Sequence, residues 1–108
     1  MSKDNIFGCF DDFNNRKERK VDNYTDGELI VDTCAVSDSD KPFETGIIHP
    51  SYADGKWIIV ELYDTKEEAL AGHVRWVKTM TAKELPRVLE DVSTCFFADI
   101  VRTADNMI

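Results

Sequence analysis

The chain has 108 residues, of which 43% are hydrophobic and 31% are charged, and its formal net charge at pH 7 is -8. This length fits one small domain, and the apolar fraction is typical of globular proteins, which argues against a wholly disordered chain. No apolar run approaches the roughly 18 residues that span a bilayer. The chain has 21 acidic and 13 basic residues. This acidic balance argues against duplex nucleic acid as a direct partner, because phosphate binding needs clustered Lys and Arg.

Residues 1–26 are unlike the rest of the chain and predict an N-terminal arm. Three phenylalanines lie in an apolar hook, Ile6–Phe13, which precedes a run of four basic residues and one acidic residue over 16–20. Two interpretations are evenly balanced: a frayed terminus whose aromatic side chains pack on the domain, and an arm that docks on a neighbouring subunit or another partner. In the second interpretation the partner-binding residues are Ile6, Phe7, Phe10, Phe13, Arg16, Lys17, Arg19 and Lys20.

Residues 27–108 are expected to form a single α+β domain, in which one main helix packs on a small antiparallel sheet of about three strands. β-branched residues over 28–36 predict the first strand. A second strand is predicted over 43–52, where Gly46 and Pro50 indicate an edge position or a bulge, because both residues weaken a hydrogen-bonded ladder.

The strongest strand is predicted over Trp57–Tyr63, after an Asp-Gly pair typical of tight hairpins. Alternation predicts one face with Ile58, Val60 and Leu62. The other face is predicted to carry Trp57, Ile59, Glu61 and Tyr63. Because both faces are mostly apolar, this strand is expected at the centre of the sheet, covered on each side.

The main helix is predicted to follow at once. Thr65-Lys66-Glu67-Glu68 matches a capping box, with Thr65 as the N-cap and Glu68 reaching back. An apolar stripe at helical spacing consists of Ala69, Leu70, His73, Val74, Trp76, Val77 and Met80. Gly72 costs roughly 1 kcal/mol relative to Ala inside a helix, and either allows a close approach to the sheet or is simply tolerated.

The C-terminal quarter is expected to be mainly helical. Pro86 is predicted to open a short helix that continues through Asp91. Ser93-Thr94 then caps a last helical segment, 93–104, although a strand over Cys95–Val101 competes with it and periodicity does not separate the two.

The cysteines and histidines form no site that is local in sequence. Cys9, Cys34 and Cys95 are odd in number and far apart, which favours a reducing compartment and argues against a zinc site. Cys34 lies in a β-rich run and Cys95 beside Phe96-Phe97, so buried, inert thiols are expected at these two positions. His73 is expected to be partly buried with one hydrogen bond, and His49 to be structural or at the surface. Cys34 paired with His49 stays open as a thiol nucleophile. So does Cys95 paired with His73, although no flanking signature supports either pair.

No catalytic, cofactor-binding or metal-binding residue is assigned, and no cofactor is expected. The five glycines stand alone, so there is no phosphate-binding loop. Asp38 and Asp40 lie in a loop that lacks the central Gly and distal Glu of a calcium-binding EF-hand. Trp57 and Tyr63 are candidate surface aromatics for an interface, whereas Trp76 on the helix stripe is expected in the core.

A longer string of residues resembles small proteins of tailed bacteriophages and prophages, a group without an established activity. The similarity lies in FETGI, HPSYADGKW, VELYDTKEEA and GHVRWV, with DTCAVSDSDKPF before them and a looser LPRVLEDVST after them. It covers the middle two-thirds of the chain and carries no catalytic or cofactor residues. The resemblance implies a viral gene product that works in a virion or in the cytoplasm of a host bacterium.

Composition and resemblance together predict a non-enzymatic phage protein that acts through protein–protein contacts. A minor component of capsid, neck or tail is the leading hypothesis, with other virion proteins as partners and a homo-oligomer left open. The alternative is an inhibitor of a host defence factor, either an acidic mimic that fills a basic groove or a binder of a small signalling molecule. A thiol enzyme ranks last.

Overall fold

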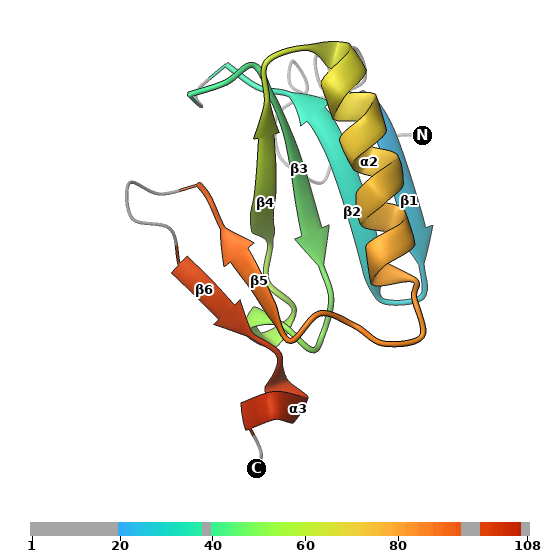
Figure 1. Ribbon diagram of the computed structural model, residues 1–108, viewed down its shortest axis with the longest axis vertical. Helices are drawn as coiled ribbons and strands as arrows, with labels where there is room; N and C mark the ends of the chain where they lie inside the picture. Colours follow the sequence, from blue (N-terminus) through green and yellow to red (C-terminus); the bar gives the residue numbers. More distant parts are fainter. Residues whose placement is uncertain (1–19, 38–39, 94–97, 107–108) are drawn as a thin grey trace, which may run out of the picture.

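The computed structural model describes residues 20–37, 40–93 and 98–106. Its main sheet is antiparallel with strand order β1-β2-β3-β4, and consists of β1 (Lys20–Asp26), β2 (Leu29–Ala35), β3 (Phe43–Ile48) and β4 (Ile58–Tyr63). Helix α2 (Lys66–Met80) covers one face of this sheet (Figure 1). The expected α+β class with one main helix is confirmed, and the main sheet has one strand more than predicted.

The additional strand comes from the predicted arm. Residues Lys20–Asp26 were expected to belong to it, but they pair with β2 as β1. The Lys20 ammonium forms an ion pair with Asp32 on the neighbouring strand, so Lys20 contacts this domain rather than extending toward a partner. The sequence of β1 is mostly polar and lacks a clear alternation of apolar residues, because an edge strand is largely solvated. The apolar hook and residues 14–19 lie outside the described residues.

A bulge separates the two halves of the β3–β4 pair. Thr45 pairs with Glu61, but Gly46 pairs with Ile59 and Ile47 with Ile58, so β4 carries one extra residue at this point. The irregularity falls at Gly46, as predicted, but the extra residue belongs to β4 and not to the strand that contains Gly46, and that strand lies inside the sheet rather than at its edge. The extra residue breaks the predicted alternation, because paired residues share a face and Ile58 thus lies with Glu61 and Tyr63.

The central position expected for the strongest strand is wrong, because β4 is the last strand in the order. Its second apolar face is explained by a neighbouring hairpin of β5 (Val88–Asp91) and β6 (Ala98–Val101). The amide of Val92, directly after β5, donates a 2.8 Å hydrogen bond to the carbonyl of Ile59. β4 is therefore apolar on both faces because it contacts this hairpin as well as the main sheet.

The C-terminal quarter differs most from the prediction. The short helix expected from Pro86 to Asp91 is wrong, since 88–91 form strand β5. Of the two alternatives for the last segment, the strand is confirmed over 98–101, and a short helix, α3 (Thr103–Asn106), follows it. Pro86 does not open a helix because its carbonyl accepts a hydrogen bond from the hydroxyl of the buried Tyr52, which fixes this segment against the β3–β4 connection.

The predicted start of α2 is confirmed, with Thr65 as its N-cap, although Glu68 reaches back to the amide of Asp64 rather than to that of Thr65. The Thr65 hydroxyl accepts a 3.1 Å hydrogen bond from the amide of Glu68, and the Glu68 carboxylate accepts one of 3.2 Å from the amide of Asp64. The buried face of the helix consists of Ala69, Gly72, His73 and Met80. Leu70 and Val74 of the predicted stripe are exposed instead, because the buried face is rotated toward Gly72.

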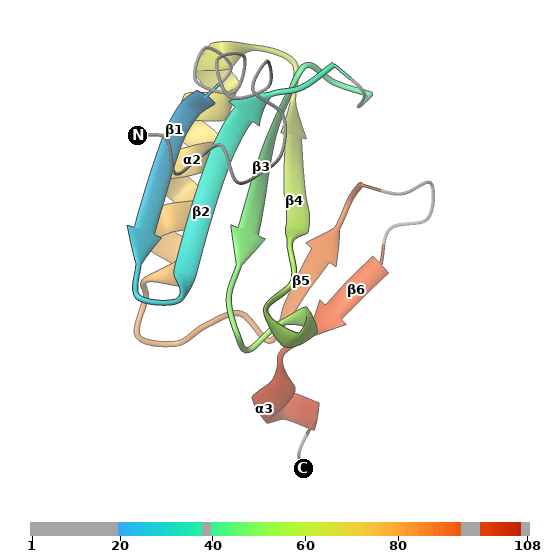
Figure 2. The ribbon, with the colours of Figure 1, turned by 180° about the vertical axis from the view of Figure 1, so that it is seen from behind.

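The core lies between the main sheet and α2 and extends to β5. Its fully buried apolar side chains are Val31, Ile47, Tyr52, Ile58 and Leu89. Seen from behind, in Figure 2, the sheet carries no described helix on its second face. The helix thus covers only one face of the sheet. The candidate site lies between α2 and the outer strand β1.

Candidate binding site

A chain of buried polar groups crosses the main sheet under α2. The Thr33 hydroxyl lies 2.8 Å from Nδ1 of His73 and 2.6 Å from the Thr45 hydroxyl. The Thr45 hydroxyl lies 2.9 Å from that of Tyr63. All four side chains are buried, since their exposed fractions do not exceed 4%. Such a network rigidifies the interface between helix and sheet, because each buried polar group has a partner.

The network ends at Glu61 on β4. The Glu61 carboxylate accepts hydrogen bonds from the Tyr63 hydroxyl at 3.1 Å and from Nε1 of Trp76 at 2.8 Å. It also accepts one from the Arg75 guanidinium, with which it forms an ion pair. Trp76 is half-buried and packs on the core, as the sequence predicts. These three donors keep Glu61 oriented over the end of the buried chain.

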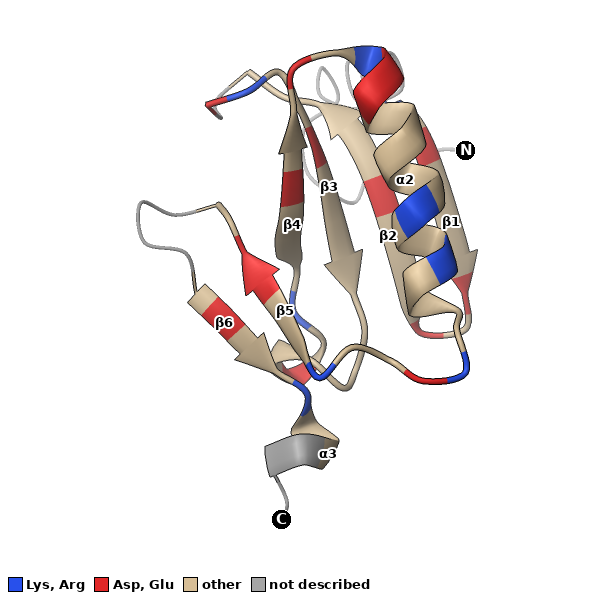
Figure 3. Ribbon diagram, in the orientation of Figure 1, with Lys and Arg blue, Asp and Glu red and all other residues tan. Residues whose placement is uncertain are grey.

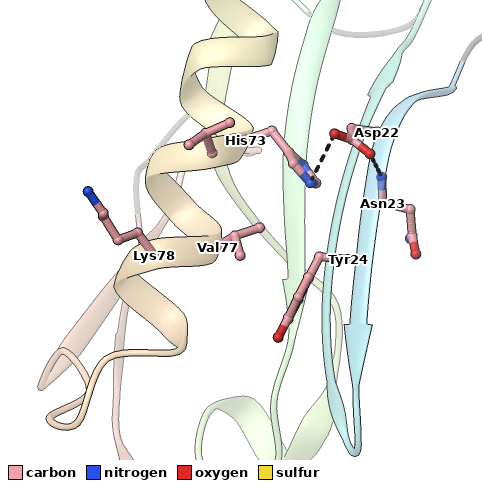
Figure 4. Close-up of a pocket in the computed structure, with 7 residues that line it drawn as sticks. Asp22, Asn23, Tyr24, His73, Val77 and Lys78 are labelled. Carbon is pink, nitrogen blue, oxygen red and sulfur yellow. Dashed lines mark hydrogen bonds and ion pairs between the residues drawn. The ribbon is translucent and has the colours of Figure 1, made fainter.

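At its other end the network opens into a groove of about 410 Å³ between α2 and β1. The groove is lined by both elements, with Asp22, Asn23, Tyr24, His73, Val74, Val77 and Lys78 around it (Figure 4). Val74 is 63% exposed, the largest exposed fraction among the exposed large apolar side chains of the described residues. The groove therefore combines an open apolar wall on the helix with polar groups from the strand.

His73 and Asp22 face each other at the inner side of the groove. Nε2 of His73 lies 3.9 Å from Oδ2 of Asp22, and the two side chains are 4% and 54% exposed. Burial lowers the pKa of His73 below its ordinary value, while the nearby carboxylates of Asp22 and Asp32 act in the opposite direction. Because the net effect lowers the pKa of His73 below 6.5, the neutral imidazole predominates at pH 7.

The outer edge of β1 borders the same groove. β1 is the first strand in the sheet order, and within the described part of the chain no strand pairs with its outer side. Backbone groups on this side of β1 are a template for a further strand, since edge strands present unpaired amides and carbonyls, although the amide of Asn23 already donates to the Asp22 carboxylate. The groove and this edge, which run side by side along α2 and β1, are together named the β1–α2 site.

The two candidate surface aromatics have different outcomes. Trp57 is 42% exposed and its ring lies over Gly46, so it is a surface residue as predicted. Tyr63 is only 4% exposed and is part of the buried network, so its assignment to the surface is wrong. Its position on the helix side of β4 follows from the bulge and from the close approach of Gly72.

The thiol pair Cys34–His49 is not assembled. Cys34 of β2 pairs with Glu44 of β3, whereas His49 follows the far end of β3. Five residues of extended strand separate the two positions, or roughly 16 Å at about 3.3 Å per residue. His49 has a structural role instead, as its Nδ1 accepts a 3.0 Å hydrogen bond from the amide of Ser51. Cys9 and Cys95, and hence the pair Cys95–His73, lie outside the described residues.

Asp22, His73 and Thr33 are aligned in the order of a catalytic triad, but the hydroxyl cannot reach a substrate. Thr33 has no exposed surface, and its hydroxyl contacts both His73 and Thr45. A nucleophile must be able to approach the reacting atom within about 3–3.5 Å. What the arrangement can do is bind: it presents an acceptor nitrogen, a carboxylate and an apolar wall to a ligand in the groove.

Charge is unevenly distributed around this site. Figure 3 shows acidic residues on all six strands, whereas Arg75 and Lys78 lie on α2. Lys20 is the single basic residue in the described strands. In the described ranges no group of three His, Cys, Asp or Glu residues is arranged to hold a metal ion, and no helix is long and apolar enough to cross a membrane.

Sequence reasoning missed the β1–α2 site. The polar residues Asp22, Asn23 and Tyr24 fall in the segment predicted to be an arm, and His73 and Val74 were both placed on one buried stripe. Two exposed apolar residues four positions apart on a helix, Leu70 and Val74, were the available signal.

Comparisons of the chain with protein-family models, with curated proteins and with solved structures find no match. What the site does is therefore argued from its geometry.

Proposed function

We propose that the protein acts through protein–protein contacts, as a minor structural or assembly component of a tailed-phage particle, and that the β1–α2 site binds its partner. The observation that carries this proposal is the outer edge of β1, with which no described strand pairs, beside a groove with an exposed apolar wall. The phage setting comes from the sequence resemblance alone.

Edge strand and groove support the same mode of binding. An extended segment of a partner adds to β1 through backbone hydrogen bonds, and every second side chain then points toward α2. Val74 and Val77 offer such a side chain an apolar surface, and Tyr24 adds an aromatic ring. Backbone pairing supplies affinity, and the groove supplies selectivity.

The arm remains part of the proposal. Its apolar hook, Ile6–Phe13, is followed by basic residues up to Arg19 and joins the domain at the first residue of β1. Contacts made by the arm and by β1 would therefore form one continuous surface on the partner. Ordering such a segment on a partner would enlarge the contact that the domain makes.

A host protein is the alternative partner. The acidic residues on the strands and the net charge of -8 favour a basic surface on that partner. This alternative predicts that complex formation weakens strongly as the salt concentration rises.

The test is the copy number of the protein in purified particles. Mass spectrometry against the major capsid protein should give a fixed, substantial ratio for the wild-type chain. Val74→Asp, which places a charge on the groove wall, should lower that ratio several-fold. Val88→Asp is the matched control, because Val88 is an exposed valine of β5 outside the groove. Absence from particles, with abundance in infected cells, would contradict the assembly role and favour the host partner.

A further inference from the structure

We propose that the groove binds a primary ammonium group, that of a lysine side chain, between Nε2 of His73 and the carboxylate of Asp22. The inference deepens the proposed function, on which it rests in taking that lysine to belong to the bound protein. It names the chemistry that the β1–α2 site recognises.

The buried hydrogen bonds of the network run in one direction. The Glu61 carboxylate accepts, so the single hydroxyl hydrogen of Tyr63 is donated to it. Tyr63 must then accept from the Thr45 hydroxyl, which has no second hydrogen to give. Thr45 must in turn accept from Thr33. The polarity of the whole chain is thus set by the carboxylate at its end.

The direction of these hydrogen bonds also determines which ring nitrogen of His73 carries the hydrogen. Because the Thr33 hydroxyl donates to Thr45, it can only accept from the imidazole 2.8 Å away. Nδ1 of His73 therefore carries the hydrogen, and a neutral ring has no second one. Nε2 is left with a lone pair that points into the groove.

Two acceptors consequently face each other. Nε2 of His73 and Oδ2 of Asp22 lie 3.9 Å apart, and in the described part of the chain no side chain donates a hydrogen bond to either atom. Asp22 uses its other oxygen, Oδ1, to accept from the amide of Asn23. Figure 4 shows the His73 ring directed toward Asp22 across the groove. Nε2 faces the groove and Asp22 is 54% exposed, so both acceptors are accessible to a donor that enters the groove.

An ammonium group fits the gap in number and charge. It has three donors, and a nitrogen placed about 2.8 Å from each acceptor can donate to both. Its charge complements the Asp22 carboxylate, and its hydrocarbon stem can lie along Val77 and Tyr24. Lys78, which also lines the groove, points away from the Asp22–His73 pair (Figure 4).

The position of the hydrogen on His73 is tested first. The full chain, labelled with ¹⁵N in its two histidines, is observed by long-range ¹H–¹⁵N NMR at pH 7.5. The expected result is a protonated Nδ1 and an unprotonated Nε2 in His73. A hydrogen on Nε2 would overturn the proposal, because the groove would then present a donor next to Asp22.

Binding is tested on the same chain with n-butylammonium, which mimics a lysine side chain, and with n-butanol as its uncharged counterpart. n-Butylammonium should shift the Nε2 signal of His73 in a saturable manner, and n-butanol should not. Asp22→Asn should weaken this binding about tenfold or more, since a charged hydrogen bond is lost. Asp99→Asn on β6 is the matched control, an exposed carboxylate outside the groove, and should bind as the wild type does.

The outcomes separate this inference from the proposed function. Incorporation into particles that depends on Val74, without any response of His73 to n-butylammonium, would overturn the ammonium site and retain the assembly role. A saturable response that Asp22→Asn abolishes would support the site even if the protein were absent from particles. Equal responses to n-butylammonium and n-butanol would overturn it, because the groove would then select for apolar shape alone.

Discussion

Gly72 of α2 lies directly against the phenol ring of Tyr63. A Cβ atom at position 72 would come within 2.2 Å of the Tyr63 hydroxyl oxygen and 2.4 Å of Cε1 of its ring. The helix approaches the sheet closely at this point because residue 72 has no side chain. The contact holds the Tyr63 hydroxyl in line with Thr45, so one glycine positions the centre of the buried network.

Gly72→Ala is therefore expected to destabilise the fold, although alanine favours a helix by about 1 kcal/mol over glycine. Tyr63 is 4% exposed and cannot turn away into solvent, so the helix must shift. Overpacking of this kind costs about 1–3 kcal/mol, which the gain in helix propensity offsets only in part, so we expect a net loss of up to about 2 kcal/mol. Urea denaturation of the variant and the wild type measures the difference. A variant more stable than the wild type would contradict the close contact.

The Tyr63 hydroxyl is expected to contribute to stability as a member of the network. Tyr63→Phe leaves the Thr45 hydroxyl without its acceptor and removes a donor to Glu61. A buried unsatisfied group costs about 1–3 kcal/mol, which urea denaturation can resolve. The control is Tyr24→Phe, which removes a hydroxyl that bonds to Asp26 at 3.3 Å in an exposed position and should change stability much less than Tyr63→Phe does. Equal effects of the two variants would contradict a special role for the network.

The sequence predicted those elements whose signals are local. The start of α2 is specified by Thr65 and Glu68, three positions apart in the chain, and a turn of helix brings them together wherever the helix packs. Gly46 indicates an irregularity in the strand pair, and the ring of Trp57 packs against it. Such signals need no knowledge of the tertiary structure.

The errors have tertiary causes. Strand β1 was missed because its partner, β2, supplies the apolar residues of the pair, while β1 itself is polar. Pro86 suits the start of a helix, so the sequence predicts a helix where 88–91 form a strand. In the structure the Pro86 carbonyl accepts a hydrogen bond from the Tyr52 hydroxyl. The buried network was not foreseen, since its members come from β2, β3, β4 and α2, up to 40 residues apart.

Gly46 offers a contrast with Gly72. A Cβ atom at position 46 would come within 2.1 Å of Cζ2 of Trp57, but this ring is 42% exposed and is free to swing into solvent. Gly46→Ala is therefore expected to cost only about 1–2 kcal/mol, the value of the ring contact that is lost. The indole N–H resonance of Trp57 should move toward the position of an exposed tryptophan. The resonance of Trp76, whose indole donates to Glu61, should not move and serves as the internal control.

Stability is expected to fall on mild acidification because of His73. Burial is the main cause that lowers its folded-state pKa below 6.5, so the unfolded chain binds the proton more readily than the folded one. The stabilisation from a neutral His73 is thus complete above about pH 6.5 and decreases as the pH falls below that value. His49 acts in the same direction, since burial lowers its pKa as well.

Urea denaturation between pH 7.5 and 5.5, above the range in which most carboxylates titrate, measures the effect of His73. The wild type should lose stability across this range, and His73→Gln should lose less, whatever its stability at pH 7.5. His49→Gln shows how much of the slope belongs to the other histidine. Asp22 opposes the effect of burial, because an ion pair with its carboxylate 3.9 Å away favours the imidazolium. If the wild type instead gained stability on acidification through His73, that ion pair would outweigh burial and the ring would be charged in the folded protein.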